Sequence, residues 1–226
     1  MPTYKLQYFD ARGVAETIRY MFAVAKVEYE DARFPLTFGT PGDFSTMTRK
    51  EFDEAKASGE LACSAGKVPY LEVDGVKVGQ SKAIERFLAK ELGLAGDSAL
   101  QFLQIDAICE QVRDIKEAYN NCKRGKEGAE KEAALATWFG ETLPADVKKM
   151  EGMIPANKGP FLFGEKISLA DLTVFQFLAA HQGFYDNTEG AKASFQACAA
   201  IKSAMEATAE NEGVKAWIEK RPKTDI

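Results

Sequence analysis

The spacing of apolar and polar residues changes once along the chain, near residue 95. Before that point, alternation predicts short strands, and apolar residues recurring at helical spacing predict the helices between them. The predicted elements are a strand at 3–9, a helix at 15–25, a strand at 27–30, a helix at 50–56, strands at 68–73 and 76–78, and a helix at 81–92. Asp74-Gly75 between the last two strands is a strong hairpin sequence. The order β-α-β-α-β-β-α predicts an α/β domain with a mixed sheet.

Beyond residues 93–97, which are predicted to form a linker, the spacing is helical almost to the end. Helices are predicted at 99–123, 130–154, 169–182 and 191–208. Ser168 and Asp171 have the spacing of a capping box, which starts a helix and implies no chemistry. The sequence therefore predicts two domains: residues 1–92 form the α/β domain, and residues 98–226 form an all-α helical bundle.

Composition and charge exclude several classes of partner. The 226 residues include 29 Lys and Arg against 34 Asp and Glu, and neither half has the basic excess that nucleic-acid binding requires. No stretch is apolar over the length needed to cross a bilayer, and the N-terminus lacks the pattern of a secretory leader. We therefore expect a cytoplasmic protein that binds neither nucleic acid nor membrane.

Cysteine and histidine are too sparse to predict a metal site. The four cysteines, at positions 63, 109, 122 and 198, lack the spacing of zinc ligands, and His181 is the one histidine. Free thiols in a reducing compartment are the simpler interpretation. His181 lies in an apolar stretch and no GxSxG sequence precedes it, which argues against Ser-His-Asp catalysis. The first predicted strand-to-helix turn carries no cysteine, so thioredoxin-type exchange has no nucleophile.

The remaining candidates are Tyr8 at the end of the first strand, Val68-Pro69 before the third, and Gln80-Ser81 at the start of a helix. Each has a purely structural explanation as well. Tyr8 could be a half-buried core aromatic, Val68-Pro69 an ordinary strand entry, and Ser81 an ordinary helix cap.

Taken together, the three features fit one ligand. Strand ends and helix N-termini of such a sheet converge on one edge, where the helix at Ser81 offers free N–H groups to a carboxylate. A cis Val68-Pro69 bond would expose the Val68 N–H and C=O to a peptide-like molecule. The Tyr8 hydroxyl could donate its hydrogen to a thiolate and stabilise the ionised form. An anionic peptide thiol satisfies all three.

These residues also carry a family resemblance. The segments YKLQYFDARGVAETIRY, GKVPYLEVDG and GQSKAIERFLAKELGLAG, with the SLAD box and the tail VKAWIEKRPKTDI, resemble the cytosolic glutathione transferases of the sigma class. That class includes glutathione-dependent prostaglandin D synthases and the S-crystallins of cephalopod lenses. The resemblance runs along the whole chain apart from residues 34–66. It implies a thioredoxin-like domain that binds glutathione, a helical domain that completes a pocket for an apolar electrophile, and a homodimer.

The resemblance also implies roles for single residues. Tyr8 would be the catalytic tyrosine, and glutathione would contact Tyr8, Phe52, Lys56, Lys67, Val68, Pro69, Gln80, Ser81 and Asp114. Within this set, Gln80 and Ser81 would hold the γ-glutamyl carboxylate, and Phe52 and Lys56 match the family's contacts to the glycyl end. Asp114 would reach the amino group of the glutathione bound to the partner subunit, although a solvated helix acid explains it equally well.

Three departures from the sigma pattern bear on function. Val14 stands where these enzymes usually carry an arginine close to the tyrosine hydroxyl, so one means of favouring the thiolate is lost. Residues 34–66 form a longer segment than the family's. Arg113 stands beside Glu110 and Asp114 where vertebrate prostaglandin D synthase binds a divalent metal, which argues against that metal site.

The resulting hypothesis is a homodimeric glutathione transferase that needs glutathione as co-substrate and no metal. Two alternatives remain open. One is an isomerase of the prostaglandin D synthase type, which uses glutathione as a cofactor. The other is a non-catalytic ligand-binding or crystallin-like protein. The residues of the helical domain do not identify the electrophile.

Overall fold

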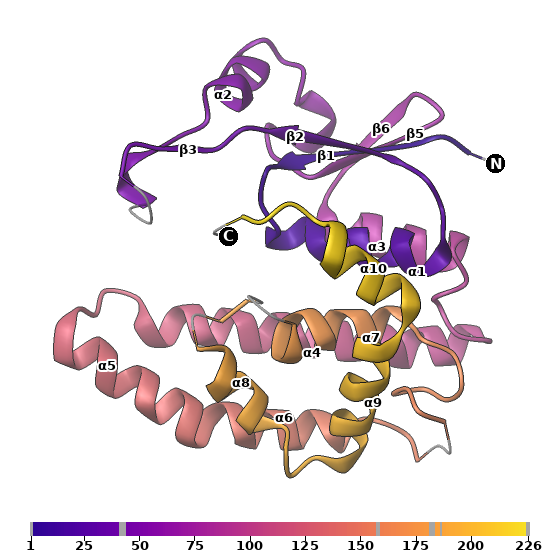
Figure 1. The fold of residues 1–226 in the computed structure, drawn as a ribbon, viewed down its shortest axis with the longest axis vertical. Coiled ribbons are helices and arrows are strands. Elements are labelled where there is room, and N and C mark those ends of the chain that lie inside the picture. The colour runs from indigo at the N-terminus through magenta and orange to yellow at the C-terminus, as the bar shows by residue number, and fades with distance from the viewer. Residues whose placement is uncertain (1, 41–43, 157–158, 181–183, 186, 225–226) are drawn as a thin grey trace.

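The structure, a computed structural model, describes residues 2–40, 44–156, 159–180, 184–185 and 187–224 (Figure 1). In chain order its first part comprises β1 (Tyr4–Phe9), η1 (Gly13–Ala15), α1 (Glu16–Ala25), β2 (Glu30–Phe34), β3 (Thr37–Phe38), η2 (Phe44–Thr46), β4 (Met47–Thr48), α2 (Lys50–Ala57), η3 (Ala62–Ser64), β5 (Tyr70–Val73), β6 (Val76–Gly79) and α3 (Ser81–Glu91). The second part is helical, with α4 (Ala99–Lys123), α5 (Gly128–Thr137), the π-helical turn η4 (Trp138–Thr142), α6 (Leu143–Glu151), α7 (Leu169–Val174), the π-helical turn η5 (Phe175–Ala179), α8 (Thr188–Ser194), α9 (Ala199–Glu210) and α10 (Glu212–Lys220).

The sheet has the order β2-β1-β5-β6 and is mixed, as predicted. Strand β1 runs parallel to β2 and antiparallel to β5, and β5 and β6 form the predicted hairpin. Asp74 and Gly75 both have positive φ, 48° and 85°, as a two-residue hairpin turn of this kind requires. Helices α1 and α3 lie between the sheet and the helical part, and α2 lies on the other side of the sheet (Figure 1). This is a thioredoxin-like domain followed by a helical domain.

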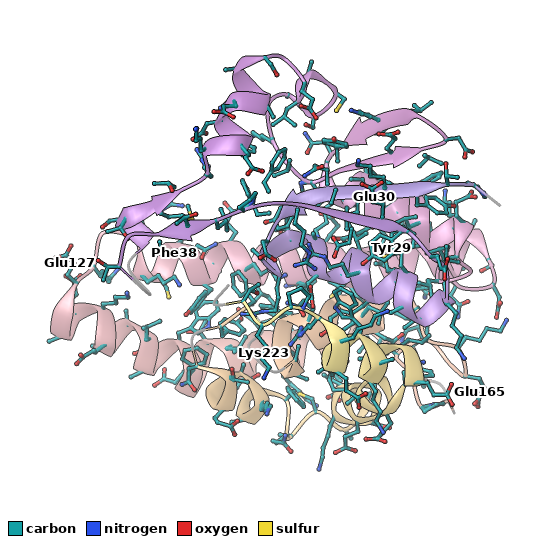
Figure 2. All side chains as sticks on the ribbon, turned by 45° about the horizontal axis from the view of Figure 1, so that its top comes forward. Tyr29, Glu30, Phe38, Glu127, Glu165 and Lys223 are labelled. Carbon is teal, nitrogen blue, oxygen red and sulfur yellow. The ribbon has the colours of Figure 1, made fainter. Side chains whose placement is uncertain are left out.

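The predicted strand at 27–30 is wrong in its bounds, because β2 begins at Glu30 and ends at Phe34. Lys26 adopts a left-handed conformation that ends α1, and the Val27 N–H then donates to the Phe22 carbonyl oxygen at 3.1 Å. Tyr29, labelled in Figure 2, stacks on Phe22 with ring centroids 4.2 Å apart. The residues before Glu30 therefore turn the chain and pack on the core before pairing with β1 begins.

The helical part differs from the prediction in four places. The predicted helix at 130–154 contains the π-helical turn η4, and the predicted helix at 191–208 is two helices, α8 and α9. Helix α10 was not predicted. The helix predicted at 169–182 extends through η5 to Ala179, and its predicted end lies outside the described residues. The capping box of Ser168 and Asp171 is confirmed.

Helix α10 packs closely on α1, the helix that follows Tyr8 in the chain. A Cβ atom at Gly213 would lie 2.5 Å from the Ala23 carbonyl oxygen, so only glycine permits this approach. At the same contact, the buried Glu16 carboxylate accepts hydrogen bonds from Trp217 Nε1 at 2.8 Å and from Arg221 at 2.7 Å. The C-terminal helix is thereby fixed to the N-terminal domain. None of the helices within the described ranges is long and apolar enough to cross a membrane.

Candidate active site

Tyr8 lies half-buried near the end of β1, next to the turn that leads into α1. The Val14 backbone N–H donates a hydrogen bond to the Tyr8 hydroxyl oxygen at 3.4 Å. Gly13 has a φ of +42°, and a Cβ atom there would lie 2.4 Å from that oxygen. A glycine at this position is therefore required to bring the backbone of the turn against the hydroxyl.

Burial raises the pKa of Tyr8, and the Val14 N–H and the Arg19 guanidinium partly offset this. Tyr8 consequently keeps its proton at neutral pH, and its O–H is available as a donor. The Arg19 guanidinium carbon lies 5.9 Å from the Tyr8 ring centroid. Arg19 is completely buried and donates to the Ala11 carbonyl oxygen at 2.6 Å and to Asp31 at 3.2 Å.

Sequence reasoning missed Arg19 as a neighbour of Tyr8. The available indication was a cation next to Ile18 on the otherwise apolar face of the first predicted helix. The Val14 side chain, which departs from the sigma pattern, is 50% exposed and brings no charge to the hydroxyl. Its backbone N–H supplies a donor instead.

Arg12 ties the C-terminal tail to the same turn. Its guanidinium donates to the Thr224 carbonyl oxygen and, at 3.2 Å, to the Thr224 hydroxyl. This tail carries Lys223 and runs from the end of α10 past the beginning of α1 (Figures 1 and 2). Thr224 is thus held next to the turn that positions Tyr8.

The Val68–Pro69 peptide bond is cis, the isomer that would expose the Val68 backbone to a peptide-like ligand, and lies directly before β5. Val68 is half-buried, Pro69 is buried and Lys67 is exposed. The Lys67 N–H donates to the Ser64 carbonyl oxygen at 3.2 Å. Lys56 is exposed on α2, and its side chain passes 3.3 Å from the position a Cβ atom of Gly66 would take. Lys56 is therefore close to the chain that leads to Val68.

Gln80 and Ser81 lie at the start of α3, beside this segment. A Cβ atom at Gly79 would lie 2.4 Å from Ser64 Cβ, so the end of β6 packs directly against the turn before Lys67. Gln80 is exposed and has a φ of 75°, a backbone conformation that is rare outside glycine and that recurs at functional sites. The first N–H groups of α3 have no partner within the helix and are available to an anion.

Phe52 and Asp114 lie in different surroundings from the rest of the set. Phe52 is 5% exposed and packs on Phe9 and Phe34, with ring centroids 4.9 and 5.8 Å away, so it belongs to a small core. Its contact with glutathione stays a prediction, and almost none of the Phe52 side chain is exposed to a ligand. Asp114 is exposed on α4.

Glu110, one of the acidic residues of α4, is paired with arginines. Glu110 forms ion pairs with Arg86 of α3 and, at 2.5 Å, with Arg113. In the part of the chain that the structure describes, no three histidine, cysteine or acidic residues are grouped as metal ligands would be. His181 lies outside the described residues.

A thioredoxin-like domain with a tyrosine hydroxyl at the end of its first strand, followed by a helical domain, defines the class of glutathione-binding transferases. The chain belongs to the glutathione S-transferase family. Sequence models of the glutathione S-transferase N-terminal domain and C-terminal domain match residues 4–90 and 113–221.

Individual relatives match this chain over almost its full length. Glutathione S-transferase S1 of Drosophila melanogaster is 32% identical over 224 residues, which cover 99% of this chain and 81% of the relative. Hematopoietic prostaglandin D synthase of Gallus gallus is 30% identical, with complete coverage of both chains. Among solved structures, a glutathione S-transferase of Necator americanus described as monomeric superimposes with a TM-score of 0.75 at 30% identity, covering 99% of this chain and 100% of the other.

Proposed function

We propose that this protein conjugates the thiolate of glutathione to apolar electrophiles and that Tyr8 activates the sulfur. The observation that carries the proposal is the Tyr8 hydroxyl, fixed at the end of β1 by the Val14 N–H and protonated at neutral pH. A protonated hydroxyl donates its hydrogen readily to a thiolate, which is a strong acceptor. It interacts only weakly with a thiol, whose sulfur still carries its own hydrogen. It therefore stabilises the thiolate more than the thiol.

In the proposed reaction, the thiol of bound glutathione loses its proton to solvent and the Tyr8 O–H donates a hydrogen bond to the resulting anion. The sulfur electron pair then forms a bond to the electrophilic carbon, and the leaving group departs with the electron pair of its own bond. The protein supplies proximity and an ionised nucleophile. No residue needs to accept a proton in the bond-forming step.

The proposed glutathione site lies along the edge formed by Val68, Gln80 and Ser81. Backbone groups of Val68 would pair with the peptide, and Ser81 with the free N–H groups of α3 would hold the γ-glutamyl carboxylate. Lys56 and Lys67, exposed beside Val68, would attract the glycyl carboxylate. In this proposal, residues 1–92 form the domain that binds glutathione and residues 98–226 form the domain that binds the electrophile. Residues 93–97 link the two domains.

The sigma class, a cytoplasmic location, a role in detoxification and a homodimer are also part of the proposal. For the dimer, the support is a set of exposed apolar side chains on α3 and α4: Phe87 is 40% exposed, Leu100 67% and Leu103 64%. Asp114 is about three helical turns beyond Leu103, on the same face of α4. A second copy of the chain covering this face would meet Asp114.

Calorimetry with Ser81→Ala tests the glutathione site. Loss of the hydroxyl should weaken glutathione binding by about 1.5–3 kcal/mol, the range for a hydrogen bond to a charged group. The matched control is Ser98→Ala, since Ser98 begins α4, where its hydroxyl accepts the Gln101 N–H at 3.1 Å. Unchanged affinity in Ser81→Ala, or an equal loss in Ser98→Ala, would contradict the assignment.

The similarity to a prostaglandin D synthase favours a glutathione-dependent isomerase as the second candidate. The two activities differ in stoichiometry, because a transferase consumes one glutathione per product and an isomerase releases it unchanged. Measuring glutathione consumption beside product formation, with an aryl halide and a prostaglandin endoperoxide as substrates, separates them.

A further inference from the structure

The two residues that contact the Tyr8 hydroxyl, Gly13 and Val14, lie between two residues whose side chains bind the C-terminal segment of the chain. The Val14 N–H donates to the hydroxyl oxygen at 3.4 Å, and a Cβ atom at Gly13 would lie 2.4 Å from it. Arg12 precedes this pair and Glu16, the first residue of α1, follows it, and both are buried. What Arg12 and Glu16 bind therefore fixes both ends of the short backbone segment that contacts the hydroxyl.

Glu16 is held by three donors. Its Oε1 accepts hydrogen bonds from Trp217 Nε1 at 2.8 Å and from Arg221 at 2.7 Å, and its Oε2 accepts from Arg19 at 3.3 Å. Arg221 directly follows α10, its side chain is 8% exposed, and it also donates to the Tyr20 hydroxyl at 3.2 Å. Hydrogen bonds between ionised groups are stronger than neutral ones, and burial strengthens them further.

Two further arginines complete the contact around the turn. Arg12 donates to the Thr224 carbonyl oxygen and, at 3.2 Å, to the Thr224 hydroxyl. Arg19 is completely buried, and it donates to the Ala11 carbonyl oxygen at 2.6 Å and to Asp31 of β2 at 3.2 Å. The turn is thus bound at the same time to β2, to α1 and to the C-terminal segment.

We propose that Arg221 is a positioning residue for glutathione transfer, which acts through Glu16 and the turn to hold the Tyr8 hydroxyl in place. Arg221 lies 205 positions after Glu16 in the chain and does not touch the reacting atoms. The inference rests on the proposed function of Tyr8. A hydrogen bond weakens steeply as its geometry departs from the optimum, and a displacement of about 1 Å in a reacting group can cost up to about 10²-fold in rate.

The test follows the pKa of the bound thiol by thiolate absorbance in the wild type and in Arg221→Met, which removes the donor to Glu16. The thiol pKa should rise, but by less than in Tyr8→Phe, because the hydroxyl is displaced and not removed. Turnover near neutral pH should fall about tenfold, within the range for a misplaced group, and the deficit should shrink as the pH rises. Affinity for S-methylglutathione, which has no thiol to ionise, should stay unchanged. Arg221→Lys keeps a charged donor and should restore most of the wild-type behaviour.

Lys26→Met is the matched control. Lys26 follows α1 and pairs with Glu212, the first residue of α10, at 3.2 Å, so this ion pair joins the same two helices at the end far from the turn. Its loss should leave the thiol pKa unchanged. Hydrogen–deuterium exchange of residues 10–16, measured without glutathione, gives a second readout. Exchange should become faster in Arg221→Met and stay the same in Lys26→Met.

The outcomes distinguish failure of this inference from failure of the proposed function. A wild-type thiol pKa in Tyr8→Phe would refute the function itself. If Tyr8→Phe does raise the thiol pKa, an unchanged thiol pKa or unchanged exchange of the turn in Arg221→Met would overturn the inference. That result would mean that the contact only stabilises the fold, even if the variant unfolds more easily. If Arg221→Met fails to fold, a chain shortened to end at Pro222, which lacks the Thr224 partner of Arg12, decides by the same two readouts.

Discussion

Gly13 shows, at the scale of a single residue, how backbone geometry serves the chemistry of Tyr8. Replacing it with alanine would place a methyl group 2.4 Å from the hydroxyl oxygen at a φ of +42°. We expect Gly13→Ala to cost about 1–2 kcal/mol of stability through the left-handed backbone. Displacement of the hydroxyl should lower turnover by up to about 10²-fold, because an error of about 1 Å in a reacting group has that effect.

Thermal unfolding and initial rates check this prediction. Gly140→Ala is the control, because a Cβ atom at Gly140 meets nothing within 4 Å and the position does not have a positive φ. It should leave turnover unchanged and leave stability equal or slightly higher. Full activity in Gly13→Ala would show that the turn does not position the hydroxyl.

Single residues were predictable where their chemistry is local. Tyr8, Val68-Pro69 and Gln80-Ser81 were identified from sequence because each follows or starts a recognisable element. The positive φ of Gln80 and the placing of Arg19 beside the Tyr8 ring were not, because the first is a backbone conformation and the second depends on how α1 packs against β1. Phe52 was matched to a ligand contact by resemblance, whereas the structure places it in a core with Phe9.

At the scale of elements, the contact between α1 and α10 holds the C-terminal helix to the N-terminal domain. Gly213→Ala would bring Cβ within 2.5 Å of the Ala23 carbonyl oxygen, and backbone atoms cannot yield cheaply. We expect a loss of about 1–3 kcal/mol, the range for overpacking a close contact. Denaturant unfolding compared with Gly140→Ala measures it. Equal stability of the two variants would mean that the helices separate without cost.

Element types followed the hydrophobic pattern, whereas several bounds did not. Residues 27–30 alternate as a strand would, but Tyr29 packs on Phe22 and β2 begins only at Glu30. The π-helical turns η4 and η5 keep an apolar periodicity close to that of an α-helix, so the sequence could not distinguish them. Helix α10 was not predicted. It is held in place by the buried Glu16, which lies about two hundred residues earlier in the chain, so a short stretch of sequence does not reveal this contact.

At the scale of the whole molecule, the exposed apolar face of α3 and α4 predicts a dimer. Leu103→Glu should weaken self-association, since it places a charge on a side chain that a second copy would bury. Dilution to the monomer should also lower the apparent affinity for glutathione, if Asp114 reaches the partner subunit's ligand.

Sedimentation combined with glutathione titration measures both effects. Met153→Glu is the control, because Met153 is 42% exposed but follows α6. A wild-type chain that remains monomeric, like the Necator americanus relative, would refute the dimer. A monomer that binds glutathione as tightly as the dimer would exclude a contact from Asp114.

The central claim is that the Tyr8 hydroxyl ionises glutathione, and the thiolate absorbance of the bound thiol across pH tests it most directly. Tyr8→Phe keeps the ring and its packing and removes only the hydroxyl, whose one hydrogen bond as an acceptor is the long, exposed one from the Val14 N–H at 3.4 Å, so stability should change little. Because the donor favours the anion, its loss should raise the pKa of the bound thiol and cut turnover near neutral pH by about 10²-fold. The deficit should shrink as the pH rises and solvent removes the proton without help. A Tyr8→Phe protein with the same thiol titration and the same rate would contradict the account.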